Sequence, residues 1–123
     1  EIQYESSEDQ FIQRVAELME EHIASSWLSV EFLASEMSMS RATFYRRMEE
    51  IMHDSPSNFI KQFRLKRATQ LLQQKRFNIS EVSHRTGFKN PRYFSKCFQK
   101  EYGVSPSVYL KQLAKPEKVT AKA

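Results

Sequence analysis

Glycine is scarce in this chain of 123 residues, with only Gly87 and Gly103 present. An average protein contains about 7% glycine, so the low content disfavours β-hairpins and glycine-rich phosphate loops. A single cysteine, Cys97, excludes an intramolecular disulfide framework and fits a reducing compartment. The sequence also contains no run of about 18 apolar residues and does not open on a signal-peptide pattern. These absences predict a soluble, cytoplasmic chain with no membrane segment.

The length leaves room for one domain, or for two very small ones that share a helix. The hydrophobic fraction of 40% supports a modest core. Because the chain begins at Glu1 and not at methionine, we expect it to be a piece of a longer protein. No residues remain for a sensory domain of ordinary size, so any signal is expected to act through the missing parts.

Charge is divided unevenly along the chain. Residues 1–36 contain nine acidic side chains and one basic side chain, whereas residues 37–123 contain eighteen basic and six acidic ones. This asymmetry favours contact between the later part and a polyanion. On charge alone, a solvated basic surface is an equally good interpretation. An alternative function is a protein-interaction module in which the acidic N-terminal helix docks a partner or a second copy.

Apolar spacing and capping residues predict an all-α fold of about seven helices. Ser29, Ser40, Ser55, Asn90 and Ser105 are candidate N-caps. The predicted helices cover roughly 8–25, 30–37, 41–52, 56–75, 80–86, 91–102 and 106–113. In the long helix 56–75 the apolar face rotates, from Phe59, Ile60 and Phe63 to Leu65, Ala68, Leu71 and Leu72. We interpret the rotation as packing against one subdomain near the start of this helix and another near its end, although one helix wrapped by a single core is an alternative.

An internal repeat with a period near 50 residues is the most informative feature of the sequence. Leu33-Ala34 pairs with Val82-Ser83, and Phe44 pairs with Phe94. The remaining pairs are Ser38-Met39 with Gly87-Phe88, Ser40 with Asn90, Met48 with Phe98, His53 with Gly103, Ser55-Pro56 with Ser105-Pro106, and Phe59-Ile60 with Tyr109-Leu110. Each copy reads as a short helix, a tight turn, a capped helix, a stop and a further capped helix. Two such copies predict two helix-turn-helix units.

The turn of each unit needs a residue that tolerates positive φ, which Gly87 supplies easily and Ser38 less easily. The predicted helices and the repeat together divide the sequence into five segments. We expect an acidic leading segment with the N-terminal helix at 1–28, the first helix-turn-helix at 29–55 and a linking helix at 56–76. The second helix-turn-helix with its closing helix follows at 77–114, and a disordered basic tail at 115–123.

Residues 29–113 resemble the AraC/XylS-type DNA-binding domain. The matching residues are Leu33-Ala34, Ser40, Arg64-Leu65, Ala68, Leu71-Leu72, Ile79, Val82, Gly87-Phe88, Tyr93-Phe94-Ser95, Phe98, Gly103, Ser105-Pro106 and Tyr109. The acidic leading helix is similar to the start of the output domain that ends hybrid two-component regulators of gut bacteria. Two residues depart from the family pattern. His53 stands where glycine is usual, and Ser83 stands where alanine is common.

The resemblance implies sequence-specific binding of double-stranded DNA and regulation of transcription, with the second helix of each unit in the major groove. The implied DNA-binding residues are Arg41, Ala42, Tyr45, Arg46 and Arg47 in the first unit, and Lys89, Pro91, Arg92, Ser95 and Lys96 in the second. Arg46 and Arg92 are the leading base readers, because arginine can bond bidentately to guanine.

An enzyme is not expected, because His22, His53 and His84 lie on separate segments without metal-ligand spacing. Cys97 is expected to be a free structural thiol, and no cofactor or metal is predicted. Further partners are expected to be RNA polymerase or other transcription machinery, and the full-length protein is a candidate homodimer.

Overall fold

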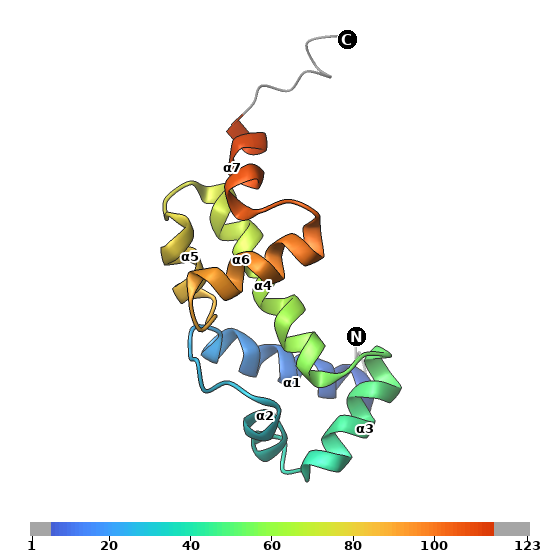
Figure 1. The fold of residues 1–123 in the computed structure, drawn as a ribbon. Helices are drawn as coiled ribbons and strands as arrows, with labels where there is room; N and C mark the ends of the chain where they lie inside the picture. The colour runs from blue at the N-terminus through green and yellow to red at the C-terminus, as the bar shows by residue number, and fades with distance from the viewer. Residues whose placement is uncertain (1–5, 115–123) are drawn as a thin grey trace, which may run out of the picture. The chain divides into compact units, whose positions relative to one another are not determined.

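The computed structural model describes residues 6–114, which form seven α-helices and no strand (Figure 1). This confirms the predicted all-α fold. The predicted disordered tail at 115–123 lies outside the described residues. The helices are α1 (Ser7–His22), α2 (Val30–Glu36), α3 (Arg41–Met52), α4 (Pro56–Gln74), α5 (Ile79–Arg85), α6 (Pro91–Tyr102) and α7 (Pro106–Ala114).

Side-chain caps fix where most of these helices begin. The hydroxyls of Ser29 and Ser40 and the amide of Asn90 each accept a hydrogen bond from the backbone N–H three residues on. Ser55 and Ser105 do the same for α4 and α7. The five predicted N-caps are therefore confirmed.

The start of α5 and the end of α1 differ from their predicted positions, by one residue in α5 and by three in α1. Helix α5 begins at Ile79, one residue before Ser80, because Asn78 caps it and forms a reciprocal capping box with Glu81. Helix α1 ends at His22, short of the predicted residue 25. There the backbone N–H of Ser25 turns back to the carbonyl of His22.

The chain divides into two compact units on either side of the bond between Arg64 and Leu65, which lies within α4. The core of the first unit joins α1, α2, α3 and the first part of α4, and Ile60 is the buried residue that α4 contributes. The core of the second unit receives Leu65, Ala68 and Leu72 from the rest of α4. The predicted rotation of the apolar face of α4 is thus confirmed, since its two parts belong to two different cores.

Backbone hydrogen bonds repeat in the two turns. The N–H of Met39 donates to the carbonyl of Ala34 at 2.9 Å, and the N–H of Phe88 donates to the carbonyl of Ser83 at 3.1 Å. Ser38 and Gly87 have φ values of 58° and 83°, as the repeat predicted. Ala34 and Ser83 are both buried, so a small residue lies at the crossing of each helix pair. The two helix-turn-helix units are therefore equivalent at the level of individual backbone bonds.

Candidate nucleic-acid interface

Helix α3 separates its apolar and polar side chains onto opposite faces. Phe44 and Met48 are fully buried in the core of the first unit. Ala42, Tyr45 and Arg46 are exposed on the other side of the helix. A helix fixed by its buried face presents the opposite side chains in a constant register, which base reading in a groove requires. Three of the predicted DNA-binding residues therefore lie together on one exposed surface.

Arg41, the first residue of α3, is exposed but already has a protein partner. Its Nε donates to Oε2 of Glu31 at 2.6 Å, which links α3 to the first turn of α2. The pKa of the Glu31 carboxyl lies below its ordinary value, first because its backbone N–H bonds to it and then because Arg41 does. Glu31 is therefore ionised at neutral pH, and the pair carries no net charge.

Arg47 differs from the other four predicted residues of α3, because it is partly buried. Its guanidinium lies over the ring of Phe11 in α1, with Cζ 4.9 Å from the ring centroid. Its Nε is buried and has no hydrogen-bond partner among residues 6–114. Part of this side chain therefore packs against α1, and the role of Arg47 in DNA binding stays a prediction.

Helix α6 has the same two-faced arrangement in the second unit. Phe94 and Phe98 are fully buried, and their rings lie 5.7 Å apart. Of the predicted DNA-binding residues, Arg92 and Lys96 are exposed on α6 and Lys89 is exposed in the turn before it. Pro91 and Ser95 are partly buried. These three predicted cations come from the turn and the first half of α6, as expected of a helix that enters a groove by its N-terminal end.

Two residues that the sequence analysis left out of the site lie at its edges. Tyr93 is 47% exposed on α6, although it was recognised only as part of the family pattern. Glu31 holds Arg41, and no local pattern reveals this, because the two residues are ten apart and lie on different helices. Only the crossing of α2 and α3 brings them into contact.

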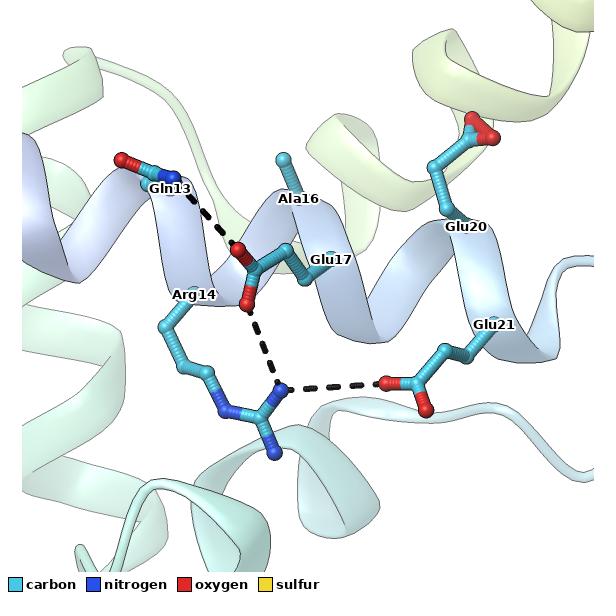
Figure 2. Close-up of a pocket in the computed structure, with 6 residues that line it drawn as sticks. All are labelled: Gln13, Arg14, Ala16, Glu17, Glu20 and Glu21. Atoms are coloured by element: carbon cyan, nitrogen blue, oxygen red, sulfur yellow. Dashed lines mark hydrogen bonds and ion pairs between the residues drawn. The ribbon is translucent and has the colours of Figure 1, made fainter.

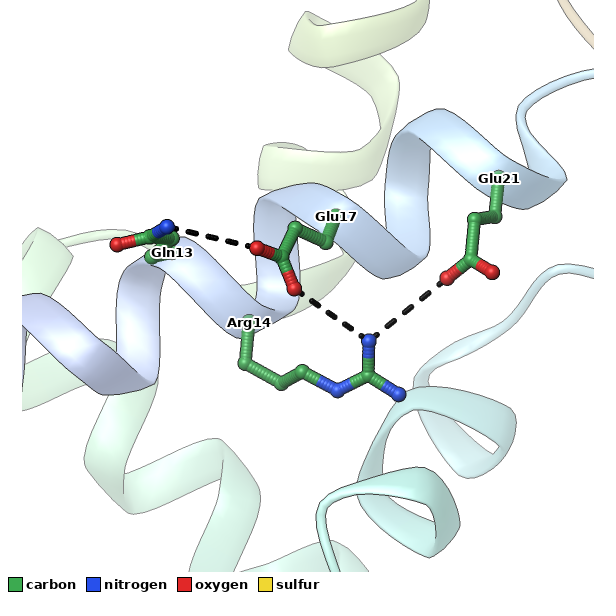
Figure 3. Close-up of polar contacts among 4 residues, drawn as sticks. All are labelled: Gln13, Arg14, Glu17 and Glu21. Carbon is green, nitrogen blue, oxygen red and sulfur yellow. Dashed lines mark hydrogen bonds and ion pairs between the residues drawn. The ribbon is translucent and has the colours of Figure 1, made fainter.

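The acidic surface of α1 is partly neutralised by an arginine of the same helix. A groove on this helix is lined by Gln13, Arg14, Ala16, Glu17, Glu20 and Glu21 (Figure 2). Arg14 Nη1 lies 3.5 Å from Glu17 and 3.7 Å from Glu21, and Gln13 donates to the other oxygen of Glu17 (Figure 3). The exposed carboxylates leave this surface negative, so it is unsuited to a phosphate backbone.

Within residues 6–114, no group of three or more His, Cys, Asp or Glu side chains could hold a metal ion. Cys97 is a free, partly buried thiol on α6. No helix in this range is long and apolar enough to cross a membrane.

Sequence comparison connects this geometry to known proteins. A family model described as a helix-turn-helix domain matches residues 33–112. The chain is also 38% identical over 109 residues to histidine kinase P4 of Formosa agariphila. That match covers 89% of this chain but only 8% of the kinase, so the chain spans a small fraction of this relative's length.

Solved structures share the fold. One is a transcriptional regulator of Chromobacterium violaceum with an AraC-type DNA-binding domain, with a TM-score of 0.78 and 28% identity over 89% of this chain and 96% of that chain. Another is the DNA-binding domain of the global transcriptional factor AdpA in complex with a target DNA. It has a TM-score of 0.76 and 30% identity, and the match covers 82% of this chain and 90% of that chain.

Proposed function

Because this chain belongs to the AraC-type family of helix-turn-helix DNA-binding domains, we propose that it inserts α3 and α6 into two successive major-groove segments of one duplex. Arg46 and Arg92 are the leading base readers, and Tyr45, Ser95 and Lys96 contact bases or phosphates. Arg41, Ala42, Arg47, Lys89 and Pro91 complete the proposed interface. Transcription is regulated through this binding.

The observation that carries the proposal is the pairing of a buried and an exposed face in both α3 and α6. Phe44 and Met48 anchor one helix, and Phe94 and Phe98 anchor the other at equivalent positions. Each anchored helix presents an exposed arginine, Arg46 or Arg92, on the side away from its core.

Selection of bound duplexes from a random pool, followed by titration at several salt concentrations, tests this function. We expect two preferred base clusters about 10 base pairs apart, and an affinity that falls steeply as salt rises. The selected duplex should bind at least 1,000-fold more tightly than scrambled DNA. Equal binding of selected and scrambled duplexes would contradict the proposal.

We also propose that the chain is the output domain of a hybrid two-component regulator. The support is its similarity to one short part of a histidine kinase that is far longer than this chain. In such a protein the signal would reach the DNA-binding units from the remainder of the molecule. The test is to prepare the full-length protein in its phosphorylated and its unphosphorylated form and to repeat the DNA titration with each. The titration measures whether the two forms differ in affinity for DNA.

RNA polymerase or another part of the transcription machinery is the further partner that we propose, together with a homodimer of the full-length protein. The exposed carboxylates of α1 offer a surface that DNA would not occupy. Sedimentation of the full-length protein with and without DNA measures the dimer. Binding of purified RNA polymerase to the protein on its operator, compared between wild type and a Glu17→Gln/Glu21→Gln variant, measures the proposed contact between α1 and the polymerase.

A further inference from the structure

The ion pair between Glu31 and Arg41 is not explained by the stability of α3. Arg41 is the first residue of that helix, where the positive end of the helix dipole disfavours a cation. The two side chains are 65% and 58% exposed, so water screens their attraction and the pair contributes little to folding. The placement of the arginine at the edge of the candidate interface therefore calls for a reason other than stability.

The geometry of the bond determines which part of Arg41 remains available. Glu31 engages Nε, and no second partner contacts Arg41 among residues 6–114. The two terminal amino groups of the guanidinium therefore keep their N–H donors for another acceptor. Because Nε bonds to Glu31, the guanidinium loses part of the rotational freedom of a long side chain.

The pair also changes how Arg41 interacts with a phosphate backbone. A free arginine adds one positive charge to the non-specific attraction between protein and DNA. An arginine paired with a carboxylate adds no net charge, and the carboxylate itself repels nearby phosphates. Pairing with Glu31 therefore weakens the contribution of Arg41 to DNA affinity that is equal for all sequences. It leaves the directional hydrogen bonds of the guanidinium, which differ between bases.

We propose that Glu31 is a positioning residue that directs the terminal amino groups of Arg41 toward a base edge and withholds this arginine from the phosphates. The inference rests on the proposed function, because it assumes that α3 enters the major groove. It assigns to the first helix of the unit a part in sequence preference. Glu31 acts only through Arg41, so no residue of α2 or of the turn that follows it needs to contact DNA.

A double-mutant cycle tests the inference. The variants are Glu31→Ala, Arg41→Ala and the double substitution, each titrated with the selected and the scrambled duplex over a range of salt. Glu31→Ala should bind scrambled DNA several-fold more tightly, steepen the salt dependence by about one released counterion, and lower the ratio of specific to non-specific affinity about 5-fold or more. In the Arg41→Ala background, Glu31→Ala should leave that ratio unchanged.

Glu36→Ala is the matched control, because Glu36 is an exposed carboxylate on the same helix. It removes the same charge without touching Arg41, so it should change affinity for both duplexes by the same factor. The inference is overturned if Glu31→Ala behaves like this control, has no effect, or lowers the ratio equally with and without Arg41. A wild-type chain that failed to prefer the selected duplex would instead contradict the proposed function itself. Thermal melts of all variants check that the fold is retained.

Discussion

At the residue scale, the two copies of the repeat differ by one oxygen atom at an equivalent position. Ala34 and Ser83 both lie at the crossing of a helix pair, and both are almost completely inaccessible to solvent. The hydroxyl of Ser83 has no hydrogen-bond partner among the described residues. A buried hydroxyl that makes no hydrogen bond costs free energy, because it gives up its bonds to water on folding.

Replacing Ser83 by alanine should therefore stabilise the second unit. We expect Ser83→Ala to raise the free energy of unfolding by about 1 kcal/mol, measured by urea denaturation. The reciprocal change in the first unit, Ala34→Ser, should lower it by a similar amount. If Ser83→Ala were destabilising, the hydroxyl would have a favourable contact that the geometry does not reveal.

The pair between Glu31 and Arg41 predicts a pH dependence of stability. The pKa of Glu31 in the folded chain lies below its ordinary value of 4.5, first because of the backbone hydrogen bond and then because of Arg41. The stabilisation is present above the unfolded pKa and is lost as the pH falls through the lower, folded pKa. Wild type should therefore exceed Glu31→Gln in unfolding free energy at pH 7 by a small margin, since both side chains are exposed, and the difference should shrink below about pH 4.5. A difference that stayed constant down to pH 3 would contradict this assignment.

At the scale of helices, α3 and α6 end in the same backbone conformation with different residues. His53 has a φ of 56° and Gly103 a φ of 79°, and each N–H bonds to the carbonyl four residues earlier. The left-handed conformation strains any side chain that carries a Cβ, and glycine avoids this strain. His53 stands where the family pattern has glycine, and its φ lies in the left-handed region that glycine favours.

Substitutions at these two helix ends should change the free energy of unfolding in opposite directions. His53 is exposed, so His53→Gly loses little packing and should raise the unfolding free energy by about 0.5–1 kcal/mol. Gly103→Ala should lower it by about 1 kcal/mol. A Cβ at position 103 would meet nothing within 4 Å, so this loss would report backbone strain alone. Chemical denaturation of both variants beside wild type measures the two effects, and changes of equal sign would count against the explanation.

Helix boundaries were predictable from the sequence where a polar cap preceded an apolar pattern. Ser40 and Asn90 gave the starts of both recognition helices correctly. The start of α5 was predicted one residue late, because its capping box, between Asn78 and Glu81, overlaps a break in the apolar pattern. Lys75 also has a positive φ of 58°, which its residue type did not signal. Local patterns therefore located elements well and their irregular ends less well.

At the scale of the whole molecule, the sequence predicted the buried and exposed faces of α3 and α6 but not the contacts that their side chains make with other helices. The repeat identified the two recognition helices because buried and exposed positions recur at helical spacing in both copies. Contacts between helices carry no such signal. The bond from Arg41 to Glu31 and the packing of Arg47 on Phe11 depend on how α3 meets α2 and α1. The structure therefore gives Arg41 and Arg47 different environments.

The two units also differ in how much they offer to DNA. The exposed face of α3 combines Tyr45 and Arg46 with Arg41 at its edge, whereas α6 offers Arg92 and Lys96. If the first unit supplies more of the base reading, Arg46→Ala should weaken binding to the selected duplex more than Arg92→Ala does. Each loss should lie within about 1–3 kcal/mol and relax preference at one base position.

Arg14→Ala is the matched control for this comparison, because it removes the same charge from α1, where the arginine pairs with Glu17 and Glu21. It should alter affinity slightly and leave base preference intact, since its guanidinium lies on the acidic face of α1 (Figure 3). Selection from a random pool with each variant shows which half of the operator loses its preference. An equal loss from Arg46→Ala and Arg92→Ala would contradict the expected ordering of the two units, and unchanged preference in either variant would remove that arginine from the set of base readers. Because both helices belong to one chain, the position of the lost base cluster also shows which unit binds which half of the operator.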